Sequence, residues 1–337
     1  ILLKTVFEDD LGHLYRAGAI VDEKLDRSIW LRVLDGSGLP SRAIIESFED
    51  ARAIADAIHG AQLAADPIFL ADDGVPGLGC DHVPGQPLNR VLTRARDEAF
   101  PLQPDNALLI VEKLALALAS GESVSYSGTP LAHGFLHPGL IYLSNDGEAV
   151  VTGFGVGPAL LGAIGDPGAA AGVRAYLAPE ALTEKTPSQR ADVYSLGAIL
   201  FHLLTGTALP ANPDDRPAAL DSAHVAWDGE GLADDIRTVL NRALAPEAGG
   251  RFASAGEFRT ELDGLIYGGA YSPTTFNLAL FMDRLFRSEI EEDELAVERE
   301  SEIDVRPYLE VETVAPEPSP ETPIAETADP TPAPEAI

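Results

Sequence analysis

Cysteine is nearly absent from this chain of 337 residues, basic residues are scarce, and no long hydrophobic run is present. The single cysteine, Cys80, excludes an internal disulfide and a cysteine-rich zinc site, and it fits a reduced, cytoplasmic setting. Lys and Arg number 23 against 54 Asp and Glu, and the net charge of −31 argues against nucleic-acid or anionic-membrane partners. No apolar run reaches the ~18 residues that a membrane helix needs, so we expect no membrane segment within this chain.

Hydrophobic residues make up 45% of the chain, which is enough for a sizeable core. The first part alternates strand-like runs with acidic or glycine-containing turns and includes one helical stretch. We expect strands near residues 2–7, 14–17, 28–34, 67–71 and 78–80, and one helix from Ser41 to Ile58. A Pro/Gly-rich joint follows at residues 83–87, and the pattern beyond it is helical.

Four helices are expected after the joint, near residues 105–119, 192–205, 234–244 and 254–265. A fifth, at residues 276–290, places Phe281, Leu285 and Phe286 on one face. Residues after about Ser301 are rich in Pro, Glu and Thr, a composition that buries too little apolar surface to fold. We therefore expect a small lobe at 1–83, a larger lobe at 84–267, a helical extension at 268–300 and a disordered acidic tail at 301–337.

The most specific motif lies between residues 172 and 206. It contains Ala-Pro-Glu, ending at Glu180, and then Asp-Val-Tyr-Ser-Leu-Gly, beginning at Asp192, with Arg251 about fifty residues later. This order and spacing resemble protein kinases of the bacterial Ser/Thr, or Hanks, type over roughly residues 1–267. The resemblance implies a bilobal protein-kinase-like fold of the α+β class, with a small antiparallel β-sheet lobe and a larger, mainly helical lobe.

The resemblance also implies structural roles for four residues. Glu180 and Arg251 would form a partly buried ion pair that holds their segment against the helical lobe. Asp192 stands where the family uses a carboxylate to accept backbone N–H bonds from the catalytic loop. His133 matches the family's packed core histidine at the start of that loop.

The catalytic positions of the family are replaced. Its catalytic loop, His-Arg-Asp-Leu-Lys-Pro-x-Asn, corresponds here to His-Gly-Phe-Leu-His-Pro-Gly-Leu from His133 to Leu140. The general base has become Phe135, which cannot accept a proton, and a magnesium-binding Asn has become Leu140. The family's Asp-Phe-Gly is Gly-Phe-Gly, so Gly153 replaces the magnesium-binding carboxylate while the packing Phe154 remains.

The nucleotide-binding positions are altered as well. Arg32 stands in place of the strand lysine, and Trp30 stands where a small Ala faces the adenine, so its indole is expected to fill part of the pocket. Gly12 alone survives from the glycine-rich loop, and Glu8, Asp9 and Asp10 bring negative charge to the expected phosphate position. Cys80 aligns with the rear of the pocket. The acidic helical partner of Arg32 would be Glu49 or Asp50, of which spacing favours Asp50.

These replacements predict a pseudokinase, a catalytically inactive kinase-like domain that acts as a signalling or scaffold module by binding a protein partner. We expect no cofactor, with at most weak binding of ATP and no magnesium. One alternative is an unconventional ATP-binding Ser/Thr protein kinase with residual activity. A second is the cytoplasmic kinase-like domain of a longer, membrane- or envelope-linked protein.

Overall fold

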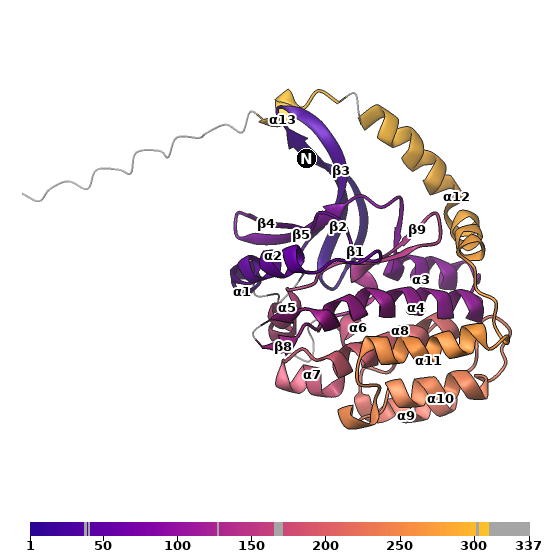
Figure 1. Ribbon diagram of the computed structural model, residues 1–337. Helices are drawn as coiled ribbons and strands as arrows, with labels where there is room; N and C mark the ends of the chain where they lie inside the picture. Colours follow the sequence, from indigo (N-terminus) through magenta and orange to yellow (C-terminus); the bar gives the residue numbers. More distant parts are fainter. Residues whose placement is uncertain (37–38, 40, 127, 165–170, 301–302, 310–337) are drawn as a thin grey trace, which may run out of the picture.

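The computed structural model describes residues 1–36, 39, 41–126, 128–164, 171–300 and 303–309. Its N-terminal part is a five-stranded antiparallel sheet in the order β1-β2-β3-β5-β4 (Figure 1). The strands are β1 (Leu2–Asp9), β2 (Gly12–Val21), β3 (Lys24–Val33), β4 (Ile68–Asp72) and β5 (Val75–Asp81). Each expected strand is present, and most are longer than predicted because tight turns join β1 to β2 and β2 to β3.

The helical stretch of the small lobe differs from the single helix that we predicted. It is divided into α1 (Ser41–Glu46) and α2 (Phe48–Ala57). Ser47 lies between them, and its hydroxyl donates a 2.6 Å hydrogen bond to the carbonyl of Ile44. Such a side-chain bond to the preceding turn competes with regular helical bonding, and it marks the division.

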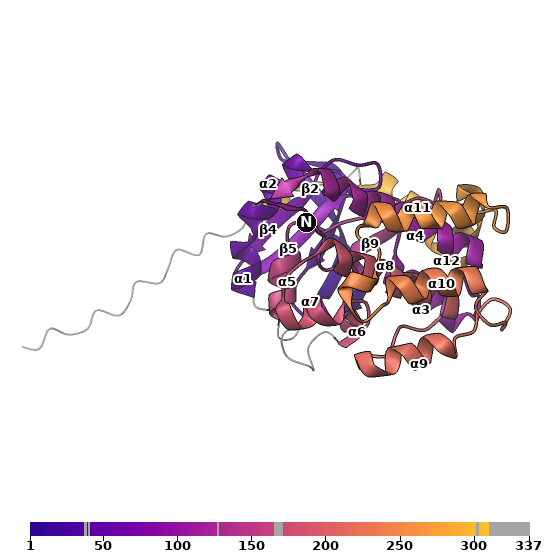
Figure 2. The same cartoon turned by 60° about the horizontal axis from the view of Figure 1, so that its bottom comes forward.

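The larger lobe is mainly helical, and Figure 2 shows α4, α8, α10 and α11 packed side by side. Its helices are α3 (Leu88–Asp97), α4 (Pro104–Ala119), α5 (Gly157–Ala163), α6 (Ala171–Arg174), α7 (Pro179–Glu184), α8 (Gln189–Thr205), α9 (Arg216–Asp221), α10 (Asp234–Ala243) and α11 (Ala255–Tyr267). Its short strands are β6 (Gly85–Pro87), β7 (Ser125–Tyr126), β8 (Thr129–Pro130), β9 (Ile141–Ser144) and β10 (Ala149–Val151). The α+β class predicted from the sequence is confirmed.

One hydrophobic core runs through both lobes. It is centred on α4 and α8, which are apolar nearly all round and are buried as predicted. A second, smaller cluster of Leu14, Trp30, Cys80 and Tyr142 fills the junction between the sheet and β9. This junction is where the kinase resemblance places the nucleotide.

The helical extension α12 (Thr275–Glu300) is much longer than the predicted 276–290 and is kinked at Phe286. Its first half packs on the helical lobe, where Phe281 stacks on Phe100 with ring centroids 5.4 Å apart. The guanidinium groups of Arg90 and Arg94, both on α3, lie 5.4 and 5.3 Å from the centre of the Phe286 ring. Both arginines also form ion pairs with Glu289.

The second half of α12 crosses to the sheet (Figure 1). Asp293 accepts hydrogen bonds from Lys4 at 2.8 Å and from Arg16 at 3.0 Å. Glu300 accepts a further bond from Arg16 at 2.5 Å. Because Arg16 lies on β2 and is only 2% exposed, this end of α12 neutralises a buried charge of the small lobe. The extension therefore ties one lobe to the other.

The predicted tail lies mostly outside the described residues, since only 303–309 of 301–337 are described. They include the short helix α13 (Arg306–Leu309). The exact boundaries of lobes, extension and tail stay a prediction. No helix among the described residues has both the length and the apolar character needed to cross a membrane.

We predict that Arg16→Met lowers the free energy of unfolding by about 3 kcal/mol, because Asp293 and Glu300 lose their buried cation. Urea unfolding followed by circular dichroism measures the change. The matched control is Arg287→Met, which removes an exposed ion pair with Asp283 on the same helix and should leave the urea midpoint unchanged. Equal midpoints for the Arg16 variant and the parent chain would contradict the interlobe role of α12.

Candidate functional site

The loop that corresponds to the kinase catalytic loop is held in place by Asp192. This buried carboxylate accepts hydrogen bonds from the backbone N–H groups of His133 and Gly134, both at 2.7 Å. Burial raises the pKa of Asp192 to about 7, although the two hydrogen bonds act in the opposite direction. The contact is the one that the sequence resemblance implies for an aspartate at the start of this helix.

His133 is fully buried and lies at the first position of the loop. Its Nε2 donates to the carbonyl of Thr152 at 2.8 Å, and its Nδ1 accepts from the N–H of Phe135 at 3.2 Å. One ring nitrogen therefore donates while the other accepts, which defines a neutral imidazole. Burial lowers the pKa of His133 to about 4, so the ring is a structural group at neutral pH.

Hydrocarbon occupies the positions where the family places its base and its metal ligands. Phe135 is completely buried in the main core, with its ring edge-on to His137 at 5.5 Å between centroids. Leu140 is 1% exposed, and a Cβ added to Gly153 would lie 3.1 Å from the Leu140 methyl carbon Cδ1. A magnesium ion needs oxygen ligands, which these three side chains do not offer, so the residues present do not fit a bound metal.

Trp30 lies where the resemblance places the adenine. Its indole is 2% exposed and stacks on Tyr142, with ring centroids 5.4 Å apart and planes inclined by 16°. The indole Nε1 donates a 3.1 Å hydrogen bond to the carbonyl of Val83, in the segment that joins the two lobes. The side chain thus combines a flat apolar body with a hydrogen bond to the joint, the two features with which the pocket would hold a purine.

Arg32 is turned toward Asp9. One guanidinium nitrogen, Nη1, donates to Asp9 Oδ1 at 2.8 Å, and the other, Nη2, donates to the carbonyl of Gly139 at 2.9 Å. Asp9 Oδ2 accepts a 2.6 Å bond from Asn89 on α3, so this carboxylate links both lobes. Because Arg32 is 1% exposed, the ion pair is largely shielded from solvent. A carboxylate of the chain itself stands where the resemblance places a phosphate.

The turn that carries Asp9 is short and closely packed. Gly12 has φ +125°, and a Cβ there would lie 2.4 Å from the carbonyl oxygen of Val33, so packing alone requires glycine. Asp10 Oδ2 accepts a 2.7 Å bond from the N–H of Gly172, at the start of α6. The turn is therefore attached to the helical lobe at two adjacent carboxylates.

The expected helical partner of Arg32 is not found, and this part of the prediction is wrong. Glu49 and Asp50 both lie on α2 with exposed side chains, whereas the ion-pair partner of Arg32 is Asp9. Spacing could not detect this, because the partner comes from a turn whose path depends on the packed lobes. Cys80 is buried behind Trp30 as expected, and burial raises the pKa of its thiol to about 12.

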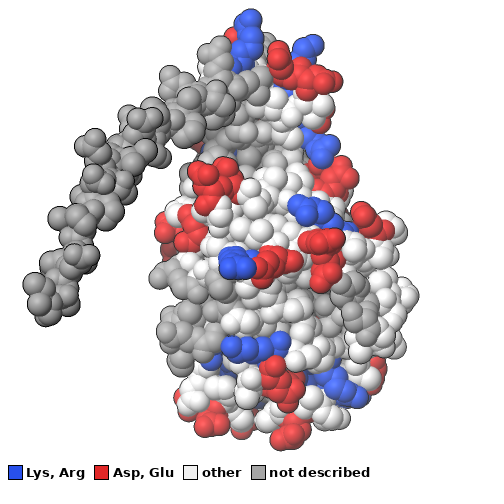
Figure 3. All heavy atoms as spheres, turned by 90° about the vertical axis from the view of Figure 1, so that its left-hand side faces the viewer, with Lys and Arg blue, Asp and Glu red and all other residues white. Residues whose placement is uncertain are grey.

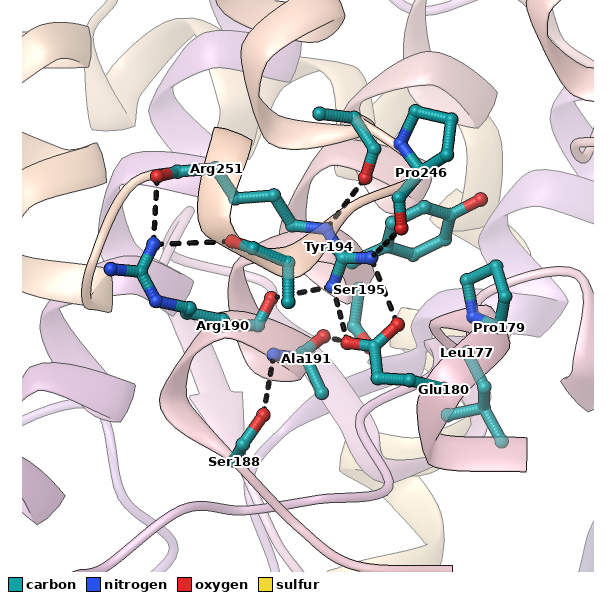
Figure 4. A network of polar contacts seen from close by, with 12 residues as sticks. Leu177, Pro179, Glu180, Ser188, Arg190, Ala191, Tyr194, Ser195, Pro246 and Arg251 are labelled. Carbon is teal, nitrogen blue, oxygen red and sulfur yellow. Dashed lines mark hydrogen bonds and ion pairs between the residues drawn. The ribbon is translucent and has the colours of Figure 1, made fainter. Parts of the chain in front are cut away.

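Figure 4 shows the Glu180–Arg251 pair, which joins the first turn of α7 to the segment that precedes α11. Arg251 donates to the two Glu180 oxygens at 2.6 and 2.9 Å and to the carbonyls of Ala245, Pro246 and Arg190 at 2.8–3.1 Å. All five of its N–H groups are used. Its guanidinium also lies 4.8 Å from the centre of the Tyr194 ring.

Sequence reasoning missed several residues of the cleft. Asn89, Tyr142 and Val83 contact Asp9 or Trp30, and no motif marks them. Arg16 was also missed. The sequence did contain a signal for it. Arg16 lies on β2 two residues beyond the buried Leu14, so the two side chains are on the same inward face of the strand. A charged side chain on that face requires a partner.

We predict that Arg251→Met lowers the free energy of unfolding by about 3–5 kcal/mol, because several carbonyls and a carboxylate lose their common donor. Urea titration measures the change. Arg42→Met is the matched control, because the Arg42–Glu46 pair is exposed on α1, and its midpoint should stay unchanged. If Arg251→Met lowers the free energy of unfolding no more than Arg42→Met does, the Glu180–Arg251 pair does not stabilise the fold.

The loss of folding stability at acidic pH should depend on His202. Tyr176 Oη lies 2.6 Å from His202 Nδ1, and burial lowers the pKa of His202 to about 4. The unfolded chain takes up a proton near pH 6.5 while the folded chain does not, so stability is lost as pH falls from 6.5 to 4. His202→Gln should flatten that fall by about 1.4 kcal/mol per pH unit. Urea titrations between pH 6.5 and 4 test this prediction, and His224→Gln, at an exposed histidine, is the control. Equal slopes of the unfolding free energy against pH for the parent and the His202 variant would contradict the prediction.

Comparison with known proteins gives distant relatives of one kind. No protein-family model matches the chain. It is 28% identical over 172 residues to the serine/threonine-protein kinase PknB of Mycobacterium tuberculosis, covering 48% of this chain and 26% of PknB. Over 168 residues it is 33% identical to the serine/threonine-protein kinase PknK of Mycobacterium bovis, covering 48% of this chain and 15% of PknK.

A third relative is the serine/threonine-protein kinase PknL of Mycobacterium tuberculosis, 29% identical over 192 residues, or 55% of this chain and 45% of PknL. The chain thus spans about a quarter of PknB and less than half of PknL. The similarity agrees with an antiparallel sheet followed by a mainly helical lobe. The chain therefore contains a kinase-like domain related to the serine/threonine protein kinases.

Proposed function

We propose that this kinase-like domain is catalytically inactive and acts as a signalling or scaffold module that binds a protein partner. The observation that carries the proposal is the filled cleft. Trp30 makes the stacking and hydrogen-bonding contacts of a base, and Asp9 neutralises Arg32 where a phosphate would otherwise do so. A nucleotide would have to displace both groups, breaking a buried ion pair and a buried stack.

The replaced catalytic groups support the same conclusion. Loss of a general base alone lowers a rate by on the order of 10²–10⁴-fold. Here the base position is a core phenylalanine, and the two metal-binding positions carry Leu140 and Gly153. Phosphoryl transfer relies on charge neutralisation by metal ions, so a site without their ligands lacks the main source of transition-state stabilisation.

The contacts that hold the helical lobe together and join it to the sheet favour a scaffold role. The Glu180–Arg251 and Asp192 contacts hold the helical lobe, and α12 joins it to the sheet, so the domain presents a fixed surface. Acidic and basic side chains are interspersed on the face that carries β4 and α2, at the left of Figure 1 (Figure 3). Mixed charge of this kind suits recognition of a protein more than of a polyanion.

We predict that ATP, with or without magnesium, leaves the thermal unfolding temperature of the purified chain unchanged, and that labelled ATP transfers no phosphate to it or to generic protein substrates. The double variant Trp30→Ala with Asp9→Asn should gain an ATP-dependent rise, because it frees both the base position and the Arg32 charge. Trp227→Ala, at an exposed tryptophan, is the matched control and should gain none. Metal-dependent incorporation that is abolished by Arg32→Ala would instead establish the alternative, an unconventional kinase.

The scaffold half of the proposal is tested by replacing the Arg32–Asp9 pair with Met and Asn. This double variant keeps the buried site free of net charge while it removes the buried guanidinium of Arg32. In a strain that lacks the gene, the variant should restore the parental phenotype as fully as the unaltered gene. Failure to do so, with normal protein levels and thermal stability, would contradict a role that is independent of the cleft.

A further inference from the structure

The helix α12 consists of two halves that are attached to the rest of the chain in different ways. They meet at Phe286, whose backbone is not helical (φ −131°, ψ 22°), and they run in different directions (Figure 1). The first half is held by apolar packing. Five of its side chains are at most 6% exposed and belong to the main core: Leu278, Phe281, Met282, Leu285 and Phe286. The first half is therefore a fixed part of the helical lobe.

The second half of α12, residues 287–300, is held mainly by charge. Its apolar side chains are all partly or largely exposed: Ile290, Leu295, Ala296 and Val297. Its attachments are the ion pairs of Glu289 with α3 and of Asp293 and Glu300 with the sheet. In the described part of the chain, Val305 is the one buried apolar residue beyond Phe286. Salt and competing charges weaken ion pairs, so this attachment is exchangeable.

The cation beneath the second half is incompletely satisfied. Arg16 is 2% exposed, and its Nε has no hydrogen-bond partner among the described residues. Glu300 accepts a bond from Arg16 through one oxygen, while its other oxygen, Oε2, is buried without a partner in the same part of the chain. A guanidinium and a carboxylate can form two parallel hydrogen bonds, and this pair forms one. A carboxylate that reached Nε as well would bind Arg16 more tightly than Glu300 does.

The carboxylates that α12 places on the sheet define what fits there. Asp293 contacts Lys4 at 2.8 Å and Arg16 at 3.0 Å, and Glu300 contacts Arg16. The two cations lie opposite each other on the neighbouring strands β1 and β2. The two acids are seven residues apart in the sequence, which places them on one face of a helix about two turns apart. This part of the sheet therefore fits an acidic helix with that spacing, whether it comes from this chain or from another.

We propose that residues 287–300 form a latch that opens at Phe286 and then leaves Lys4 and Arg16 to an acidic helix of a partner protein. The closed latch occupies this docking surface with the chain's own carboxylates, and the partner binds by replacing them. Opening also breaks the ion pairs with α3. The proposal rests on the scaffold role proposed above, but its tests involve no nucleotide, so ATP binding would overturn that role and leave the latch intact.

The first test uses the unaltered chain and hydrogen exchange measured by mass spectrometry, at urea concentrations below the unfolding transition. A detached helix as short as the latch is marginally stable, so opening exposes its amides to exchange. Amides 291–300 should exchange at least about tenfold faster than amides 279–285, and at one common rate. Their exchange should also depend less on urea, because local opening exposes little surface.

Three outcomes of the exchange test overturn the proposal. Equal rates and equal urea dependence in both halves mean that α12 detaches only when the whole chain unfolds. Rates that rise steadily toward residue 300 mean that the helix frays from its end and has no hinge at Phe286. Raising NaCl from about 0.05 to about 0.5 M should speed exchange several-fold in the second half alone, because screening weakens its ion pairs. An unchanged rate at high salt contradicts a latch that is held by charge.

The second test measures the docking surface directly. The double variant Asp293→Asn with Glu300→Gln removes the two carboxylates of the latch from Arg16. The probe is a fluorescein-labelled peptide with the sequence of residues 287–300, and its binding is followed by fluorescence anisotropy. The peptide should bind this variant at least about tenfold more tightly than it binds the parent chain, because the latch of the parent competes as an intramolecular ligand.

The matched control is the same peptide carrying Asp293→Asn and Glu300→Gln, which should bind the double variant at least about tenfold more weakly than the acidic peptide. Adding Arg16→Met to the double variant should abolish the difference between the two peptides. Equal binding of both peptides by the double variant, or no binding, contradicts the docking surface. Equal binding of the acidic peptide by variant and parent contradicts competition by the latch. Circular dichroism shows whether the variants fold, and the exchange test needs no variant.

Discussion

The ion pair between Arg32 and Asp9 determines the arrangement of the whole cleft. A guanidinium at 1% exposure requires a counter-charge, and Asp9 at the end of β1 supplies it. In that position Asp9 also accepts a hydrogen bond from Asn89 on the helical lobe, and Asp10 accepts one from the N–H of Gly172 in α6. The end of β1 and the turn after it are thereby attached to the helical lobe.

The replacements in the cleft are consistent with one another. Glycine stands at residue 153, where the resemblance places a carboxylate, and the neighbouring Leu140 is buried in the main core. The indole of Trp30 stacks on Tyr142 and donates a hydrogen bond to the carbonyl of Val83, so this side chain is held from both lobes. The residues that differ from the family's pattern at these positions are therefore packed in the protein's own core.

Much of the scaffold could be predicted because short sequence motifs mark it. The spacing from Glu180 to Asp192 to Arg251 indicates the fold. The bulk of Trp30 indicates a narrowed pocket. The partner of Arg32 could not be predicted, since the position of Asp9 at the end of β1 relative to Arg32 and Asn89 is set only when both lobes are packed. The reach of α12 was missed for a related reason. Its acidic second half has the composition of a solvated segment, and only the buried Arg16 on a distant strand explains why it is ordered.

The double attachment of α12 also affects the cost of association. Two lobes joined by one connecting segment can change their relative angle, and a partner that contacts both must restrict that motion at an entropic cost. Here Glu289 is bound to α3 while Asp293 and Glu300 are bound to β2, so these ion pairs restrain the angle between the lobes. We expect a surface that spans both lobes to be preorganised, with a lower entropic cost of association.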